Sequence, residues 1–325
     1  MLSQKENSLR IINFDNPEYI RIEIPAHHIW YTGAGHEGYN GGGHHLPAGS
    51  TWTDIWGTEW YKELPDVMGF PRFNPLEKPE NLKNYAWPDP DDERICAKIY
   101  ETREKYDGSD VFIGGSHRDT LWEKSYMIVG MENMMEYLYT EPQYAKEILH
   151  NIMDFQMGIA KHYIKSGVEI VFMGDDLGTQ KSLLIGKEKL YEFFVPEYKR
   201  LFDFYKQHGV LISFHSCGHV EPIIDMFMEL GVNVLNPVQV TANDIVKIRA
   251  ATEGKMAING AVSTAILMNG SVSDVEAAVK NTMKVMGKNG GYFCSPDQYM
   301  PFPKENIDAF YETVNKYGKY PLDFD

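Results

Sequence analysis

A histidine and a cysteine close one of the apolar runs of this sequence, in a pattern that suits a metal ion. Residues 209–217 read GVLISFHSC, so the run ends in His215 and Cys217. Side chains two residues apart on an extended chain point to the same side. An imidazole and a thiolate held there are the donors that Zn²⁺ prefers. An ordinary polar ending of a buried strand fits the same residues.

A second cysteine near the end of the chain supplies a third donor. Cys294 closes the apolar run of residues 290–297, which reads GGYFCSPD. Three protein ligands leave one position of a tetrahedral zinc ion open, as in catalytic sites. We therefore expect His215, Cys217 and Cys294 to bind Zn²⁺. The alternative is that both cysteines are small core residues and His215 is a hydrogen-bonded core histidine.

Other polar residues stand where apolar runs end. Asp175 and Asp176 lie in GDDLGTQ, Gln239 ends NPVQ, and Asn259 lies in INGAVS. We expect Asp176 to act in catalysis, and Asp175, Gln239 and Asn259 to contact the substrate. The alternative for the acidic pair is that it caps the helix that follows.

These residues are positioned by a regular alternation of elements. Six apolar runs are nearly continuous in hydrophobicity, as parallel strands covered on both faces are; they span residues 110–117, 168–176, 209–217, 232–239, 255–263 and 290–297. Segments with helical spacing separate them. Residues 18–30 and 52–61 can supply two further strands, and eight strand–helix units close a (β/α)8 barrel, whose active site lies at the C-terminal ends of the strands.

The N-terminal third is less regular. Residues 31–110 are rich in Gly, Pro and aromatic residues, which predicts an excursion over the barrel mouth within one domain of residues 1–325. We expect Trp30, Tyr31 and Trp56 to form an aromatic substrate-binding wall; the alternative is that they pack this excursion. Five histidines of the region lack the spacing of metal ligands: His27, His28, His36, His44 and His45.

Composition excludes several classes of function. The 325 residues carry a formal net charge of −15 and no Lys/Arg-rich stripe, which excludes nucleic acid and an anionic membrane as partners. No apolar run reaches the roughly 18 residues that span a bilayer, and the first residues lack the apolar core of a signal peptide. Three cysteines cannot all pair. We expect a cytoplasmic enzyme.

Several of these segments together resemble the uroporphyrinogen decarboxylase superfamily: TDIWGTEW, GDDLGTQKSLLI, FFVPEYKRLFDFYKQHG, FHSCGHVEPIIDMFMELGVNVLNPVQ and GGYFCSPDQ. The resemblance implies a (β/α)8 barrel with an elaborated N-terminal segment. One branch of the superfamily comprises metal-independent porphyrinogen decarboxylases with an arginine-rich N-terminal stretch, and the other comprises zinc- and corrinoid-dependent methyltransferases.

Two features favour the methyltransferase branch. The place of the arginine-rich stretch reads IWYTGAGHEGY, without arginine, and His215, Cys217 and Cys294 match the His-x-Cys…Cys zinc motif in type and order. The methyltransferases often carry APGCG near the last cysteine, where this chain has CSPDQ. Gln239, Asp297 and Gln298 are therefore alternatives to Cys294 as the last ligand. Asp54, in TDIW, matches the catalytic aspartate of the decarboxylases.

The resemblance implies methyl transfer to or from cobalamin. No DxHxxG motif is present, so we expect the cobalamin on a separate corrinoid protein, which docks over the barrel mouth in an anaerobic cytoplasm. The aromatic N-terminal third favours a methoxylated aromatic substrate over a thiol such as coenzyme M. Two alternatives are a metal-independent decarboxylase that uses Asp54, and a non-catalytic barrel that binds a corrinoid or tetrapyrrole partner.

Overall fold

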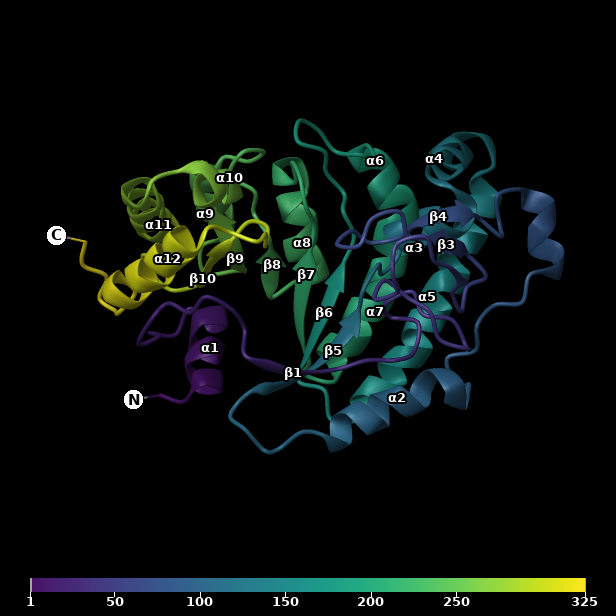
Figure 1. Ribbon diagram of the computed structural model, residues 1–325, viewed down its shortest axis with the longest axis horizontal. Helices are drawn as coiled ribbons and strands as arrows, with labels where there is room; N and C mark the ends of the chain where they lie inside the picture. Colours follow the sequence, from purple (N-terminus) through teal and green to yellow (C-terminus); the bar gives the residue numbers. More distant parts are fainter. Residues whose placement is uncertain (1, 325) are drawn as a thin grey trace.

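A curled parallel sheet forms the centre of the computed structural model, which describes residues 2–324 (Figure 1). Each strand pairs in parallel with the next, in the order β1-β5-β6-β7-β8-β9-β10. The six runs predicted from residue 110 onward all form strands of this sheet, and so does part of residues 18–30. The strands are β1 (Ala26–Ile29), β5 (Phe112–His117), β6 (Ile170–Gly174), β7 (Leu211–His215), β8 (Val234–Asn236), β9 (Ala257–Val262) and β10 (Tyr292–Pro296).

The chain just before β1 bridges the gap between the two edges of this sheet. Arg21 forms a parallel bridge with Phe293, and the backbone N–H of Cys294 donates to the carbonyl of Arg21 at 2.7 Å. The chain then runs directly into Ala26, the first residue of β1. The segment around Arg21 thus occupies the place of an eighth strand, and the fold is of the TIM-barrel type.

Helices surround the sheet (Figure 1). Their bounds are α1 (Gln4–Asn13), η1 (Pro79–Asn84), α2 (Glu93–Glu104), α3 (Trp122–Val129), α4 (Met131–Thr140), α5 (Pro142–Lys165), α6 (Lys187–Lys189), η2 (Leu190–Phe194), α7 (Val195–Gln207), η3 (Glu221–Ile223), α8 (Ile224–Leu230), α9 (Ile245–Thr252), α10 (Thr264–Asn269), α11 (Val272–Met286) and α12 (Lys304–Tyr317). Helix α11 begins with a capping box, in which the side chains of Ser271 and Asp274 each accept a backbone N–H.

The barrel interior is closed at its N-terminal end by α1. Ile11 and Ile12 of this helix are buried in one apolar cluster with inward-facing residues of several strands, among them Phe112, Ile170 and Phe293. A filled lower layer leaves the opposite end, where the strands finish, as the place for a site.

Residues 52–61 do not add a strand to the barrel, so that expectation is wrong. They contribute to a separate antiparallel sheet of β2 (Thr51–Thr53), β3 (Glu59–Tyr61) and β4 (Phe70–Phe73), which we call the cap sheet. Its strands have three or four residues each, and Trp52 and Trp60 are its buried members, paired across β2 and β3. These tryptophans pack with Met127 of α3, so the hairpin covers the mouth.

Residues 31–110 therefore contain more regular structure than the sequence predicted, including α2, which carries Cys96. The treatment of residues 1–325 as one domain stays a prediction. Among the described residues, no helix has both the length and the apolar character needed to cross a membrane.

Candidate metal centre

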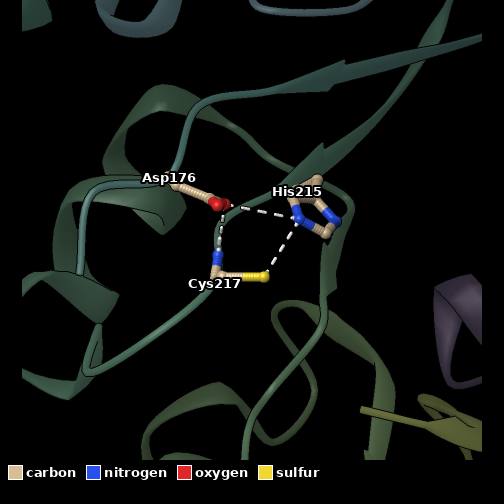
Figure 2. A group of neighbouring side chains, drawn as sticks. All are labelled: Asp176, His215 and Cys217. Carbon is tan, nitrogen blue, oxygen red and sulfur yellow. Dashed lines mark hydrogen bonds and ion pairs between the residues drawn. The ribbon is translucent and has the colours of Figure 1, made fainter. Parts of the chain in front are cut away.

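Three metal-ligating side chains converge where β6 and β7 end (Figure 2). The Nε2 atom of His215 lies 3.3 Å from Sγ of Cys217 and 3.4 Å from Oδ1 of Asp176. One donor atom from each of the three residues lies within 4.8 Å of the others, and we call Asp176, His215 and Cys217 the metal-ligand cluster. The structure therefore brings His215 and Cys217 together, and it adds Asp176, which the sequence suggested only as a catalytic residue.

The imidazole of His215 is oriented by the neighbouring strands. Its Nδ1 lies 2.9 Å from Oδ1 of Asn236 on β8, and Nδ2 of Asn236 donates to Oδ1 of Asn259 on β9 at 3.3 Å. The hydroxyl of Ser295 on β10 donates to the same Asn259 oxygen. Because Asn236 uses its oxygen toward the ring, Nδ1 of His215 carries a proton, and Nε2 faces the cluster.

The loop that carries Cys217 is held on several sides. The backbone N–H of Cys217 donates to Oδ1 of Asp176 at 2.9 Å, and that of Gly218 donates to Oε1 of Gln239 at 2.6 Å. Gly218 has φ +84°, and a Cβ there would lie 2.3 Å from the carbonyl oxygen of Gly178. A larger residue therefore cannot take this position without moving the thiol.

The electrostatics of the cluster favour a positive charge at its centre. Burial would lower the pKa of His215, but its hydrogen bonds to Asp176 and Cys217 outweigh this effect and raise the pKa to about 10. Burial likewise opposes ionisation of Asp176, and His215 together with the N–H of Cys217 lowers the pKa of this carboxyl. The donors therefore stabilise a cation between them.

A cavity of about 620 Å³ opens beside the cluster, and we call it the site cavity. The site cavity is large enough for a small organic ligand. Its walls combine the cluster with charged, thioether and aromatic side chains; the lining residues are Met68, Ser116, Arg118, Asp119, Glu123, Tyr126, Met127, Phe172, Met173, Gly174, Asp176, His215, Cys217 and Gln298.

Cys294 does not reach the cluster. On β10 the neighbouring Ser295 points to the inner face, where it meets Asn259, so Cys294 points to the outer face and is fully buried in the core. Burial raises the pKa of its thiol to about 12, and the thiolate that binds metals is not accessible there. The prediction of Cys294 as a ligand does not agree with this geometry.

Of the three alternatives to Cys294, Gln298 reaches the cluster. Its Nε2 lies 2.9 Å from Sγ of Cys217, and it lines the site cavity. Gln239 is buried under the loop and accepts the N–H of Gly218. Asp297 is buried and accepts the backbone N–H of Thr264 at 3.0 Å.

None of the residues predicted to bind substrate is among those that line the site cavity. Asp175 is fully buried and caps α3 by accepting the N–H groups of Leu121 and Glu123 at 2.9 and 2.8 Å. Because α3 precedes Asp175 in the sequence, this differs from the capping of the following helix that the alternative expected. Tyr31 and Trp56 pack against Phe155 in the core. Gln239 and Asn259 position the cluster rather than line the cavity.

Trp30 and Asp54, which were also predicted as site residues, lie outside the site cavity as well. Trp30 is 41% exposed and lines a smaller cavity next to the site cavity. Asp54 is buried, and its carboxylate accepts the N–H groups of Trp56 and Thr58 and Nε1–H of Trp60 at 2.8 to 3.0 Å. Asp54 thus closes the hairpin of the cap sheet and does not line the site cavity.

Sequence reasoning missed Arg118, Asp119 and Glu123 in the cavity wall. Arg118 and Asp119 directly follow His117, the last residue of β5, so their place after a strand was a usable signal. Glu123 lies in the first turn of α3, and no spacing pointed to it. Burial, followed by the charges of Asp119, Asp175 and Asp176, raises the pKa of Glu123 to about 8.

Asp119 connects the cavity wall to the histidine-rich region. Nε2 of His36 lies 2.5 Å from Oδ2 of Asp119, Nδ1 of His36 lies 2.6 Å from Nε2 of His44, and the N–H of Gly69 donates to Nδ1 of His44 at 2.9 Å. This order of donors requires both imidazoles to be neutral. The histidines therefore attach the cap sheet to the mouth, and none of the five belongs to the metal-ligand cluster.

Comparisons with known proteins agree with this architecture. The family model described as uroporphyrinogen decarboxylase (URO-D) matches residues 63–317. A solved structure of a methyltransferase from Methanosarcina mazei superposes with a TM-score of 0.72 at 16% identity, covering 98% of this chain and 99% of its own. At that identity the likeness concerns the fold.

Curated relatives match over shorter stretches. The methylcobamide:CoM methyltransferase MtbA of Methanosarcina mazei is 26% identical over 149 residues, which are 45% of this chain and 42% of the relative. The methylated-thiol–coenzyme M methyltransferase of the same organism is 26% identical over 181 residues, 54% of this chain and 46% of the relative. The matches thus span less than half the length of these relatives.

Proposed function

The chain belongs to the uroporphyrinogen decarboxylase family, and we propose that it is a zinc-dependent methyltransferase acting between a small substrate and the cobalamin of a separate corrinoid protein. The observation that carries the proposal is the cluster of Asp176, His215 and Cys217 in the wall of the site cavity. The methyltransferase names of the relatives support the same class of reaction.

The donor set fits a catalytic zinc ion. One imidazole, one thiol and one carboxylate are all common zinc ligands, and three of them leave a position open. Nε2 of His215 is the ring nitrogen that can bind the metal ion, because Nδ1 is held by Asn236. Gln298, beside Cys217, is the candidate for an additional contact, in place of Cys294.

When bound, Zn²⁺ would supply Lewis acidity toward the substrate atom that carries or accepts the methyl group. The chain's own residues would prepare the substrate around it. Met68, Met127 and Phe172 give the site cavity an apolar wall that limits water. Glu123 lines the site cavity and has a pKa raised to about 8 in the metal-free protein, which makes it the candidate to donate a proton to the substrate heteroatom after the methyl group leaves.

For the substrate we retain both classes, a methoxylated aromatic compound first and a thiol such as coenzyme M second. Tyr126 and Phe172 in the cavity wall give an aromatic ring surfaces to pack against. The corrinoid partner would approach the mouth where the site cavity opens. The proposed cobalt chemistry is sensitive to oxygen, so the proposal includes the cytoplasm of an anaerobic cell as the location.

The rival reaction, decarboxylation through Asp54 without metal, has less support. All the hydrogen bonds of the Asp54 carboxylate serve the hairpin of the cap sheet, and Asp54 does not line the site cavity. A non-catalytic barrel that only binds a corrinoid would not require the convergence of three metal-ligating side chains.

Methyl transfer under anaerobic conditions tests the proposal. Zinc-loaded protein is mixed with a corrinoid protein in its cob(I)alamin form and with methoxybenzoate or a methylated thiol, and absorbance follows formation of methylcob(III)alamin. We expect zinc near one equivalent per chain, and loss of both zinc and transfer in Cys217→Ala. A metal-free protein that releases CO₂ from a porphyrinogen, unaffected by Cys217→Ala, would overturn the proposal in favour of the decarboxylase.

A further inference from the structure

The site cavity adjoins a second, smaller cavity. This cavity has a volume of about 330 Å³ and is lined by Trp30, Ala34, Gly35, Glu37, Lys98, Thr102, Ser116 and Arg118; we call it the outer chamber. Ser116 and Arg118 also line the site cavity. These two residues therefore form the boundary between the two cavities, and the outer chamber lies beyond Arg118 as seen from the metal-ligand cluster.

Arg118 lies between the two cavities, and most of its N–H donors have no strong acceptor. Its Nη2 contacts Sδ of Met68 at 2.7 Å, and its Nε lies 3.7 Å from Oδ2 of Asp119, beyond hydrogen-bond distance. A thioether is a weak acceptor, whereas a guanidinium carries five N–H donors that match the two oxygens of a carboxylate. Among the described residues that line the site cavity, Arg118 is the sole Lys or Arg.

The nearby acidic side chains do not occupy the terminal nitrogens of Arg118. The carboxylate of Asp119 is bonded to His36 at 2.5 Å, and it already faces the Nε edge of Arg118. The carboxyl of Glu123 accepts the hydroxyl of Tyr126 at 3.1 Å. The terminal nitrogens of Arg118 thus remain available to a ligand.

A series of ring contacts joins the wall of one cavity to the wall of the other. The ring of Phe172, in the site cavity, lies 4.7 Å from that of His28, and His28 stacks on Trp30 at 5.5 Å and 21°. Trp30 is 41% exposed in the outer chamber. A ligand body that follows these rings would bring its far end beside Arg118.

We propose that Arg118 binds a carboxylate or sulfonate at the end of the substrate remote from the methyl-bearing atom, so that the substrate is an anion extending from the metal-ligand cluster toward the outer chamber. This inference rests on the proposed function, whose substrate class it narrows.

Matched pairs of ligands test the inference. Binding to the zinc-loaded protein is measured by calorimetry for methoxybenzoate against methoxybenzyl alcohol, and for 2-mercaptoethanesulfonate against 2-mercaptoethanol. We expect the anion of at least one pair to bind about tenfold or more tightly, and the pair that shows it distinguishes a carboxylate from a sulfonate substrate. In Arg118→Met the preference should fall to near unity, and Arg118→Lys should restore part of it.

Lys98→Met is the matched control. Its ammonium lines the outer chamber but already pairs with Glu37 at 3.2 Å, so removing it should leave the anion preference in place. Equal binding of anion and neutral analogue by the unaltered protein, or a preference that persists in Arg118→Met, would overturn the inference. Because binding is measured without turnover, failure of methyl transfer would count against the proposed function and not against Arg118.

Discussion

The Nδ1 atom of His215 lies 2.9 Å from Oδ1 of Asn236, and this contact decides which ring nitrogen faces the metal-ligand cluster. Asn236 is itself held by Asn259 on the next strand. The chain of amides therefore fixes the histidine from behind, as carboxylates or carbonyls do for many metal-binding histidines.

Removing this support should weaken metal binding. In Asn236→Ala the ring of His215 can rotate or change tautomer, so we expect zinc affinity to fall by about 10- to 100-fold, measured by competition with a chromophoric chelator. Asn236→Asp keeps an acceptor oxygen in place and should retain most of the affinity. Unchanged affinity in Asn236→Ala would show that the ring is held by other contacts.

Cys217, just after β7, and Cys294, within β10, should respond oppositely to substitution. Cys217→Ala removes a donor of the cluster, so the purified protein should lose its zinc, as measured by metal analysis. Cys294→Ala should keep its zinc, because its thiol is buried on the other face of β10. Its expected effect is a cavity in the core that lowers the free energy of unfolding by about 1–2 kcal/mol.

The reverse result would restore the ligand set expected from the sequence. Zinc lost from Cys294→Ala but not from a variant of another buried core residue, such as Ala309→Gly, would mean that β10 takes a different register when the metal is bound.

Gln298 should increase the affinity for zinc without being required for zinc binding. Its amide nitrogen lies 2.9 Å from Sγ of Cys217, and a hydrogen bond to a charged acceptor contributes about 1.5–3 kcal/mol. Gln298→Ala should therefore weaken zinc binding by about tenfold or more, yet leave a measurable site. Gln180→Ala is a suitable control, because Gln180 bonds Gln239 and Thr241 instead of the cluster. Equal affinities in both variants would exclude a role for Gln298.

The strand pattern explains how much the sequence could predict. Six strands were predicted correctly because β-branched apolar runs separated by helical periods leave little choice of fold. His215 and Cys217 were paired correctly because alternate residues share a face. The inward face of β10 could not be predicted: a strand covered on both faces is apolar throughout, so no alternation distinguishes Cys294 from Ser295.

Site residues contributed by distant segments of the chain were even harder to predict from the sequence. Glu123 lies in an ordinary helical turn, and its proximity to Asp119, Asp175 and Asp176 arises only when β5, β6 and α3 pack together. The resemblance placed Asp54 near a catalytic position, but the local hairpin uses its carboxylate for three hydrogen bonds.

Glu123 should titrate far above an ordinary glutamate. Burial and the surrounding carboxylates raise its pKa to about 8, so in metal-free protein the carboxyl should hold its proton below that pH and lose it above. The chemical shift of ¹³C-labelled glutamate side chains, assigned by comparison with Glu123→Gln, measures this directly. Zinc bound in the same cavity should lower the pKa, since a cation favours the carboxylate. A titration near pH 4.5 in metal-free protein would contradict the proposed proton donor.

His44 should make folding stability depend on pH. Burial, followed by the repulsion that a protonated His36 would exert, lowers its pKa from 6.5 to about 4, so between these values the unfolded chain binds a proton that the folded protein does not. Stability should therefore rise with pH across this window and fall as the pH drops from 6.5 toward 4. Urea unfolding at a series of pH values measures the slope. His44→Asn should reduce it, and His45→Asn, which changes an exposed neighbour, should not. An unchanged slope in His44→Asn would mean that protonation of His44 does not weaken the attachment of the cap sheet to the mouth.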